Sequence, residues 1–80
     1  MKITEPLPVL IESSIEIAWD YLALTGELGD ATVASRFLND TIELTVSRGE
    51  RRRLMLANKA IAAYQQFRRQ QSLPPVLASA

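Results

Sequence analysis

The sequence contains no cysteine and no histidine. Without cysteine, the chain has no disulfide, thiolate metal ligand or thiol nucleophile, and packing alone must hold its fold together. Without histidine, it lacks the commonest metal ligand, the usual general base and the side chain that titrates near neutral pH. Catalysis or metal binding would have to use carboxylates, hydroxyls, lysine or arginine, and we expect no enzyme activity, no metal and no cofactor.

Long apolar runs are also missing. No uninterrupted apolar run approaches the roughly 18 residues that a membrane-crossing helix requires. Near the N-terminus, Glu5, Pro6, Pro8 and Glu12 interrupt the apolar residues before the core of a signal peptide could form. We therefore expect a cytoplasmic protein that does not contact the membrane, with one domain over residues 1–80 and a thin core.

Prolines and a serine–glutamate pair suggest where the first helix begins. Pro6 and Pro8 indicate an extended N-terminal arm, because proline fixes the backbone and lacks an amide donor. Ser13 and Glu16 then have the three-residue spacing of a capping box, in which both side chains satisfy free amides at a helix start. We therefore predict that the first helix begins near Ser13.

Two further breaks divide the rest of the chain. Gly26 and Gly29 favour the end of one helix, and Asp30 is placed to cap the next. Ser47 and Glu50 repeat the capping-box spacing, and a long stretch free of glycine and proline follows them. The β-branched residues within 41–46 are compatible with a strand, but they continue a helical apolar pattern. The predicted fold is all-α: a compact three-helix bundle with helices over about residues 13–25, 31–46 and 48–71, and extended proline-containing arms over residues 1–12 and 72–80.

The first predicted helix is apolar around most of its circumference. Its acids keep to one narrow stripe: Glu12, Glu16, Asp20 and Glu27. Two other helices of this size cannot cover the remaining surface completely. We therefore predict self-association, with a dimer as the simplest form and Trp19, Tyr21 and Leu24 in the interface. The alternative is that these side chains close over a monomer, since exposed single apolar residues are common.

A net charge of zero conceals two oppositely charged halves. Residues 1–46 carry eight acids and two bases, a balance of −6, and residues 47–80 carry one acid and seven bases, a balance of +6. The basic half begins with three successive arginines at the predicted start of the third helix. The cations that could contact a phosphate or a nucleic acid are Arg48, Arg51, Arg52, Lys59 and Arg69. The alternative, which we favour, is that the acidic and basic halves pair with each other, because eight acids on so small a body would repel a duplex.

The segment ELGD, residues 27–30, resembles the second metal-binding motif of the all-α nucleotide pyrophosphohydrolases of the MazG type, which coordinate magnesium through two glutamate-x-x-acid pairs. The resemblance covers four residues and implies Glu27 and Asp30 as metal ligands. The first motif has no counterpart, because Glu12 and Glu16 are four positions apart instead of three. A helix cap at Asp30 explains the same residues, and we expect the cap.

The prediction from sequence is a small, non-enzymatic helical protein that acts through protein–protein interaction. We expect it to self-associate, with a regulatory role and an unidentified protein partner as further expectations. The alternative is a nucleic-acid-binding helical module that uses the basic start of the third helix.

Overall fold

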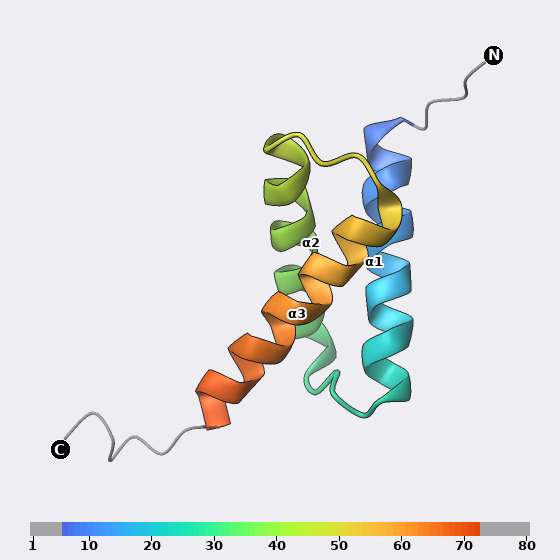
Figure 1. Cartoon of the computed structure of the whole chain (residues 1–80). Coiled ribbons are helices and arrows are strands. Elements are labelled where there is room, and N and C mark those ends of the chain that lie inside the picture. Colours follow the sequence, from blue (N-terminus) through green and yellow to red (C-terminus); the bar gives the residue numbers. More distant parts are fainter. Residues whose placement is uncertain (1–5, 73–80) are drawn as a thin grey trace, which may run out of the picture.

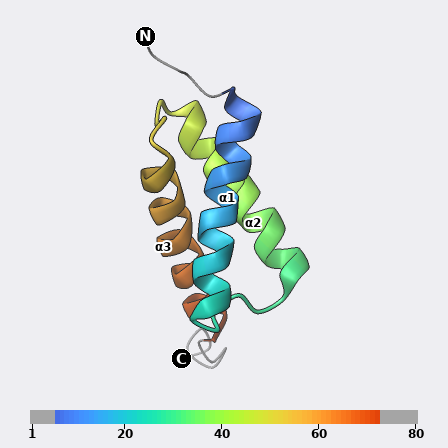
Figure 2. The same ribbon diagram turned by 90° about the vertical axis from the view of Figure 1, so that its right-hand side faces the viewer.

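The computed structural model describes residues 6–72 and shows an all-α three-helix bundle (Figure 1). Its helices are α1 (Leu7–Leu24), α2 (Ala31–Ser47) and α3 (Arg53–Ser72). Helices α1 and α2 run antiparallel, and α3 crosses one face of this pair, so that each helix contacts the other two (Figures 1 and 2). The predicted fold class is confirmed. Within residues 6–72, no helix is both long enough and apolar enough to cross a membrane.

Helix α1 begins at Leu7, well before the predicted start at Ser13. Pro6 is its N-cap residue, and Pro8 falls in its first turn. The amides of a first turn have no acceptor within the helix. A proline there, which has no N–H, therefore removes no helical hydrogen bond. Ser13 therefore lies inside the helix and does not cap it.

The predicted terminal arms are only partly described. The N-terminal arm, predicted over residues 1–12, is wrong for residues 7–12, which belong to α1, and its residues 1–5 lie outside the described part of the chain. Of the C-terminal arm, Ser72 belongs to α3, and residues 73–80 lie outside the described part.

Helix α2 begins where the sequence predicts. The Asp30 carboxylate accepts a hydrogen bond from the Val33 amide at 3.1 Å, which confirms Asp30 as its N-cap. The connection from α1 contains Gly26 and Gly29, both with positive φ, at +75° and +66°. This left-handed conformation is costly for residues that have a Cβ atom, so glycine ends α1 here.

Helix α3 begins at Arg53, five residues after the predicted start. Ser47 is the last residue of α2, and its hydroxyl donates to the Leu44 carbonyl at 2.6 Å. The expected capping box between Ser47 and Glu50 is therefore wrong. Arg51 and Arg52 lie in the turn before α3. Of the three arginines predicted at the start of the helix, only Arg53 belongs to it.

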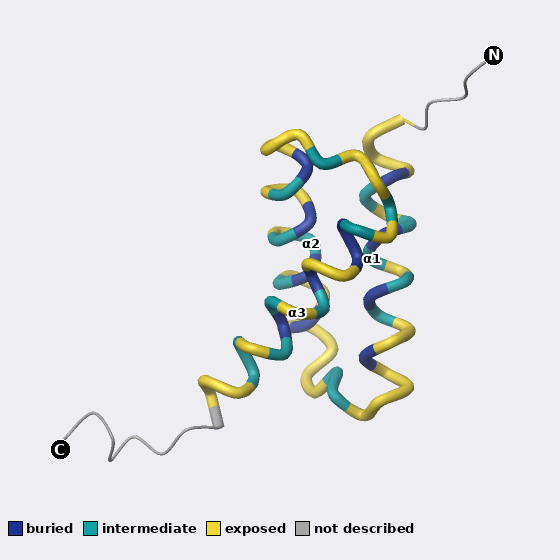
Figure 3. The backbone as a smooth tube through the Cα atoms, in the orientation of Figure 1, coloured by how far each residue is buried: buried dark blue, intermediate teal, exposed yellow. Residues whose placement is uncertain are grey.

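The core lies where the facing sides of the three helices meet (Figure 3). Every fourth residue of α1 and α2 is buried, as expected for one helix face packed on its neighbours. The buried apolar residues are Leu10, Ala18 and Leu22 of α1, Ala34, Leu38, Ile42 and Val46 of α2, and Leu56, Ala57, Ala60 and Tyr64 of α3. Four of these are alanines, which let the helices approach closely but bury little area. The core is accordingly thin, as the chain length predicts.

Tyr64 links α3 to the connection between α1 and α2 through a hydrogen bond, and its ring packs in the core. Its ring packs against Phe37 and Phe67, with centroid distances of 5.4 and 5.9 Å. Its hydroxyl donates a hydrogen bond to the Leu28 carbonyl. A buried tyrosine normally needs such a partner, since an unpaired buried hydroxyl is costly.

Candidate functional site

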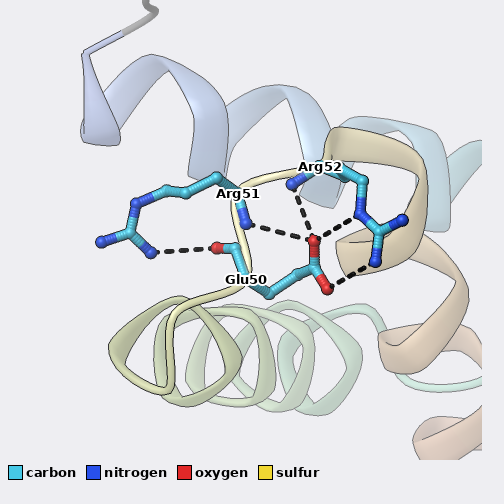
Figure 4. Close-up of polar contacts among 3 residues, drawn as sticks. All are labelled: Glu50, Arg51 and Arg52. Atoms are coloured by element: carbon cyan, nitrogen blue, oxygen red, sulfur yellow. Dashed lines mark hydrogen bonds and ion pairs between the residues drawn. The ribbon is translucent and has the colours of Figure 1, made fainter.

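The first two residues of the arginine run, Arg51 and Arg52, lie in the turn between α2 and α3 and form hydrogen bonds within it (Figure 4). One guanidinium nitrogen of Arg51 donates to the Val46 carbonyl at 2.6 Å and to the Glu50 carbonyl at 3.0 Å. The first of these bonds reaches a carbonyl in the last turn of α2 that also accepts from the Gly49 amide at 2.9 Å, and it places a positive charge at the C-terminal end of the helix, where such a charge is favourable. Arg51 therefore acts as a cap for α2.

Glu50 holds the other side of the turn. Its carboxylate accepts hydrogen bonds from the backbone amides of Arg51 and Arg52, at 3.1 and 2.9 Å, and forms an ion pair with the Arg52 side chain at 3.0 Å (Figure 4). These bonds, with the Arg52 side chain first among them, lower the pKa of Glu50 from its ordinary value of 4.5 to about 2. The acid also lies just before the N-terminus of α3, where negative charge is favourable.

The lowered pKa of Glu50 predicts a loss of stability in acid. A carboxyl group whose pKa is lower in the folded state stabilises that state above its unfolded pKa of 4.5, and the contribution is lost as the pH falls towards about 2. Near pH 3, unfolding of the wild type should take up about one proton more than unfolding of Glu50→Gln. Urea unfolding of both proteins at pH 6 and pH 3 measures this difference. Glu16→Gln, at an exposed position of α1, controls for the loss of one negative charge; equal pH dependence in wild type and Glu50→Gln would contradict the prediction.

The five cations predicted to contact an anion do not form one continuous surface. Arg48 and Lys59 line one shallow hollow of about 330 Å³ together with Thr45, Gly49 and Glu50. Arg69 lies ten residues beyond Lys59, about 15 Å further along α3. The basic track predicted from Arg48 to Arg69 is thus interrupted. Its first cluster includes an acid, and Arg51 and Arg52 are engaged in the turn.

Arg69 faces the acidic half of the chain at the far end of the bundle. It lines a hollow of about 450 Å³ with Glu27, Gln65 and Arg68. Hydrogen bonds from Thr25 and Gln65, at 2.7 and 3.0 Å, lower the pKa of Glu27, and the charges of Arg68 and Arg69 lower it further. An acid of the first half therefore meets cations of the second half here, which is the kind of internal pairing that the sequence favours.

The three residues of the predicted interface do not share one face of α1. Tyr21 is 45% exposed and Leu24 is 88% exposed, whereas Trp19 is half-buried against the core. Residues two positions apart point about 200° apart around a helix, so Trp19 and Tyr21 lie on opposite flanks. Tyr21 and Leu24 lie on the same flank. The structure therefore offers two candidate surfaces on α1 where the sequence suggested one.

The flank of Trp19 borders a shallow groove between α1 and α2, which we call the α1–α2 groove. It consists of two adjoining hollows of about 630 and 510 Å³ that share Ile15 and Asn39 in their linings. Leu7, Ile11 and Ile15 of α1 and Arg36, Asn39 and Glu43 of α2 line it. Sequence reasoning missed the groove because a helix beginning at Ser13 excludes Leu7 and Ile11. The four-residue spacing of Ile11, Ile15 and Trp19 was the available signal.

Comparison with protein-family models, with curated proteins and with solved structures finds no match to this chain.

The carboxylates considered as metal ligands have other roles or lie apart. Asp30 caps α2, and Glu27 is hydrogen-bonded to Thr25 and Gln65. Among the residues that the structure describes, no three or more acids are grouped so that they could hold a metal ion. Within residues 27–30, Asp30 therefore has the capping role that was expected from the sequence.

Proposed function

We propose that the protein acts through protein–protein interaction, and that it associates with a second copy of itself through α1. The observation that carries this proposal is the apolar surface that α3 leaves uncovered on α1. Leu24 is 88% exposed and Tyr21 45% on one flank, while Ile11, Ile15 and Trp19 remain only half-buried on the other. Apolar surface that no other element of the chain covers is a candidate interaction surface.

The size of the core supports the same proposal. A chain of 80 residues buries a smaller part of its surface than a larger domain. Seven large apolar side chains of the described residues are exposed, and they lie on all three helices: Leu7, Val9, Tyr21, Leu24, Val33, Leu44 and Leu54. A partner that covers some of them would add burial worth about 25 cal/mol per Å² of apolar area. Self-association supplies such a partner without a second gene product.

Self-association predicts a dimer at micromolar concentration. Because a partner binds the folded chain, the melting temperature should rise with protein concentration by mass action. Sedimentation equilibrium and thermal unfolding over a hundredfold range of concentration measure both quantities. A monomer at every concentration, with a constant melting temperature, would show that α1 closes over a monomer and that the proposal is wrong.

Nucleic-acid binding has less support from the described residues. Arg51 and Arg52 are hydrogen-bonded within the turn, and Glu50 and Glu27 accompany the two basic clusters. A duplex would meet these acids together with the exposed stripe of Glu12, Glu16 and Asp20. We therefore retain a non-enzymatic interaction protein, with a cytoplasmic location and a regulatory role as predictions.

A further inference from the structure

The α1–α2 groove carries unlike charges at its two ends. Glu12 lines the end near the N-terminus of α1. Glu43 lies at the same end, and Arg36 lines the opposite end. Both side chains are exposed. Arg36 and Glu43 are seven positions apart on α2, so they lie about 10 Å apart along the groove. Ile15 and Asn39 line both hollows and mark its middle.

We propose that this groove receives a second copy of the chain in an antiparallel dimer. The inference rests on the proposed self-association and names the surface that performs it. The two-fold axis would lie in the interface, cross α1 and α2 at right angles and pass near Ile15 and Asn39. Rotation about this axis lays α1 on the partner's α1 and α2 on the partner's α2, in opposite directions. The uncovered side of the α1–α2 pair, opposite α3, leaves room for this packing (Figure 2).

This symmetry turns the unlike ends of the groove into two charge pairs. An antiparallel arrangement exchanges the ends, so Arg36 of each copy faces the partner's Glu43. The match occurs twice, because a two-fold interface uses the same patch on both copies. An axis parallel to the helices would instead bring Glu12 and Glu43 of one copy against the same acids of the other. Like charges brought together in an interface are unfavourable, so the pairing of Arg36 with Glu43 favours the antiparallel direction.

The apolar residues fit the same symmetry. Ile11, Ile15 and Trp19 follow one another every four residues on α1, and all three are packed against the core yet only half-buried. Rotation about an axis at Ile15 places Ile15 against the partner's Ile15, and Ile11 against the partner's Trp19. These contacts would provide most of the affinity, while Arg36 and Glu43 fix the register. The groove is preferred over the flank of Tyr21 and Leu24 because it combines apolar surface with self-complementary charge.

Charge reversal tests the proposed pairing directly. In homodimers of Arg36→Glu, or of Glu43→Arg, both pairs become like-charged. The dimer of each variant alone should therefore be weaker than that of the wild type by a factor of about ten or more. In a one-to-one mixture, the substituted position 36 of one variant and the substituted position 43 of the other carry opposite charges and face each other. The unchanged Arg36 likewise faces the unchanged Glu43, so the mixture should form heterodimers at wild-type affinity. Sedimentation velocity with a fluorescent label on the N-terminus of one variant measures the heterodimer.

The controls separate failure of the groove from failure of self-association. Lys59→Glu makes the same change of charge on α3 and should dimerise as the wild type does, and circular dichroism checks that each variant is folded. Suppose Arg36→Glu and Glu43→Arg each dimerise normally, while a Tyr21→Ser, Leu24→Ser double variant does not. The groove would then be overturned and self-association would stand. A mixture that forms no heterodimer in preference to homodimers would also overturn the groove, whereas a wild-type monomer at every concentration would refute the self-association on which the inference rests.

Discussion

Replacing Tyr64 by alanine is expected to lower the free energy of unfolding by about 4 kcal/mol, as large-to-small changes of buried aromatic residues do. Tyr64 is 1% exposed, packs against Phe37 and Phe67, and donates a hydrogen bond to the Leu28 carbonyl. A domain of 80 residues has a total stability of about 4–12 kcal/mol. The change should therefore remove between about a third and all of this stability.

Tyr64→Phe separates the ring from the hydroxyl. It keeps the packing against Phe37 and Phe67 and loses only the hydrogen bond to Leu28, so it should cost about 1 kcal/mol. Urea unfolding followed by circular dichroism, at one fixed protein concentration, measures both variants. Equal losses in Tyr64→Ala and Tyr64→Phe would mean that the ring contributes little and that α3 is packed differently.

Replacing Leu38 by alanine should lower the free energy of unfolding by about 3 kcal/mol, because it leaves a cavity at the centre of the core. Leu38 is fully buried on the face of α2 that meets α1 and α3. Leu44→Ala is the matched control, since Leu44 lies on the same helix and is 51% exposed. Its loss should be within about 0.5 kcal/mol. The same urea titration compares the two variants, and a larger loss at Leu44 would show that α2 buries its other face.

Local signals in the sequence predicted α2 well. Asp30 offers a short acceptor at the required position, and glycine precedes it where the backbone has positive φ. Ala34, Leu38 and Ile42, at four-residue spacing, then give the helix one apolar face, which is buried. These features depend on neighbours within one or two turns, so the sequence contains all that is needed to find them.

The starts of α1 and α3 were mispredicted because a capping-box spacing is not sufficient evidence for a cap. Ser13 and Glu16 have that spacing inside α1, and Ser47 and Glu50 have it across the end of α2. At the first site, proline in the first turn allowed the helix to begin earlier. At the second, Glu50 turned towards the amides of the residues that follow it. The serine hydroxyl found an acceptor in α2 instead.

The roles of the arginines could not be derived from the chain alone. Arg51 reaches back five residues to the Val46 carbonyl, and this contact exists only because α2 ends where it does. The α1–α2 groove likewise depends on the early start of α1 and on the side of the α1–α2 pair that α3 covers. Such features follow from how elements meet, which periodicity along one helix does not specify.

The hydrogen bonds of the α2–α3 turn and the bond from Tyr64 to Leu28 differ in the length of the chain segment that lies between the two bonded residues. Those of Glu50 and Arg51 join residues at most five positions apart, whereas the Tyr64 bond joins residues 36 apart. Closing a longer loop costs more entropy, although the cost grows only slowly with length. During folding, the contacts between nearby residues are therefore favoured to form before the contact between distant ones. The junction of α2 and α3 can form from nearby residues alone, while the attachment of α3 to the α1–α2 connection must wait until α2 spans the distance between them.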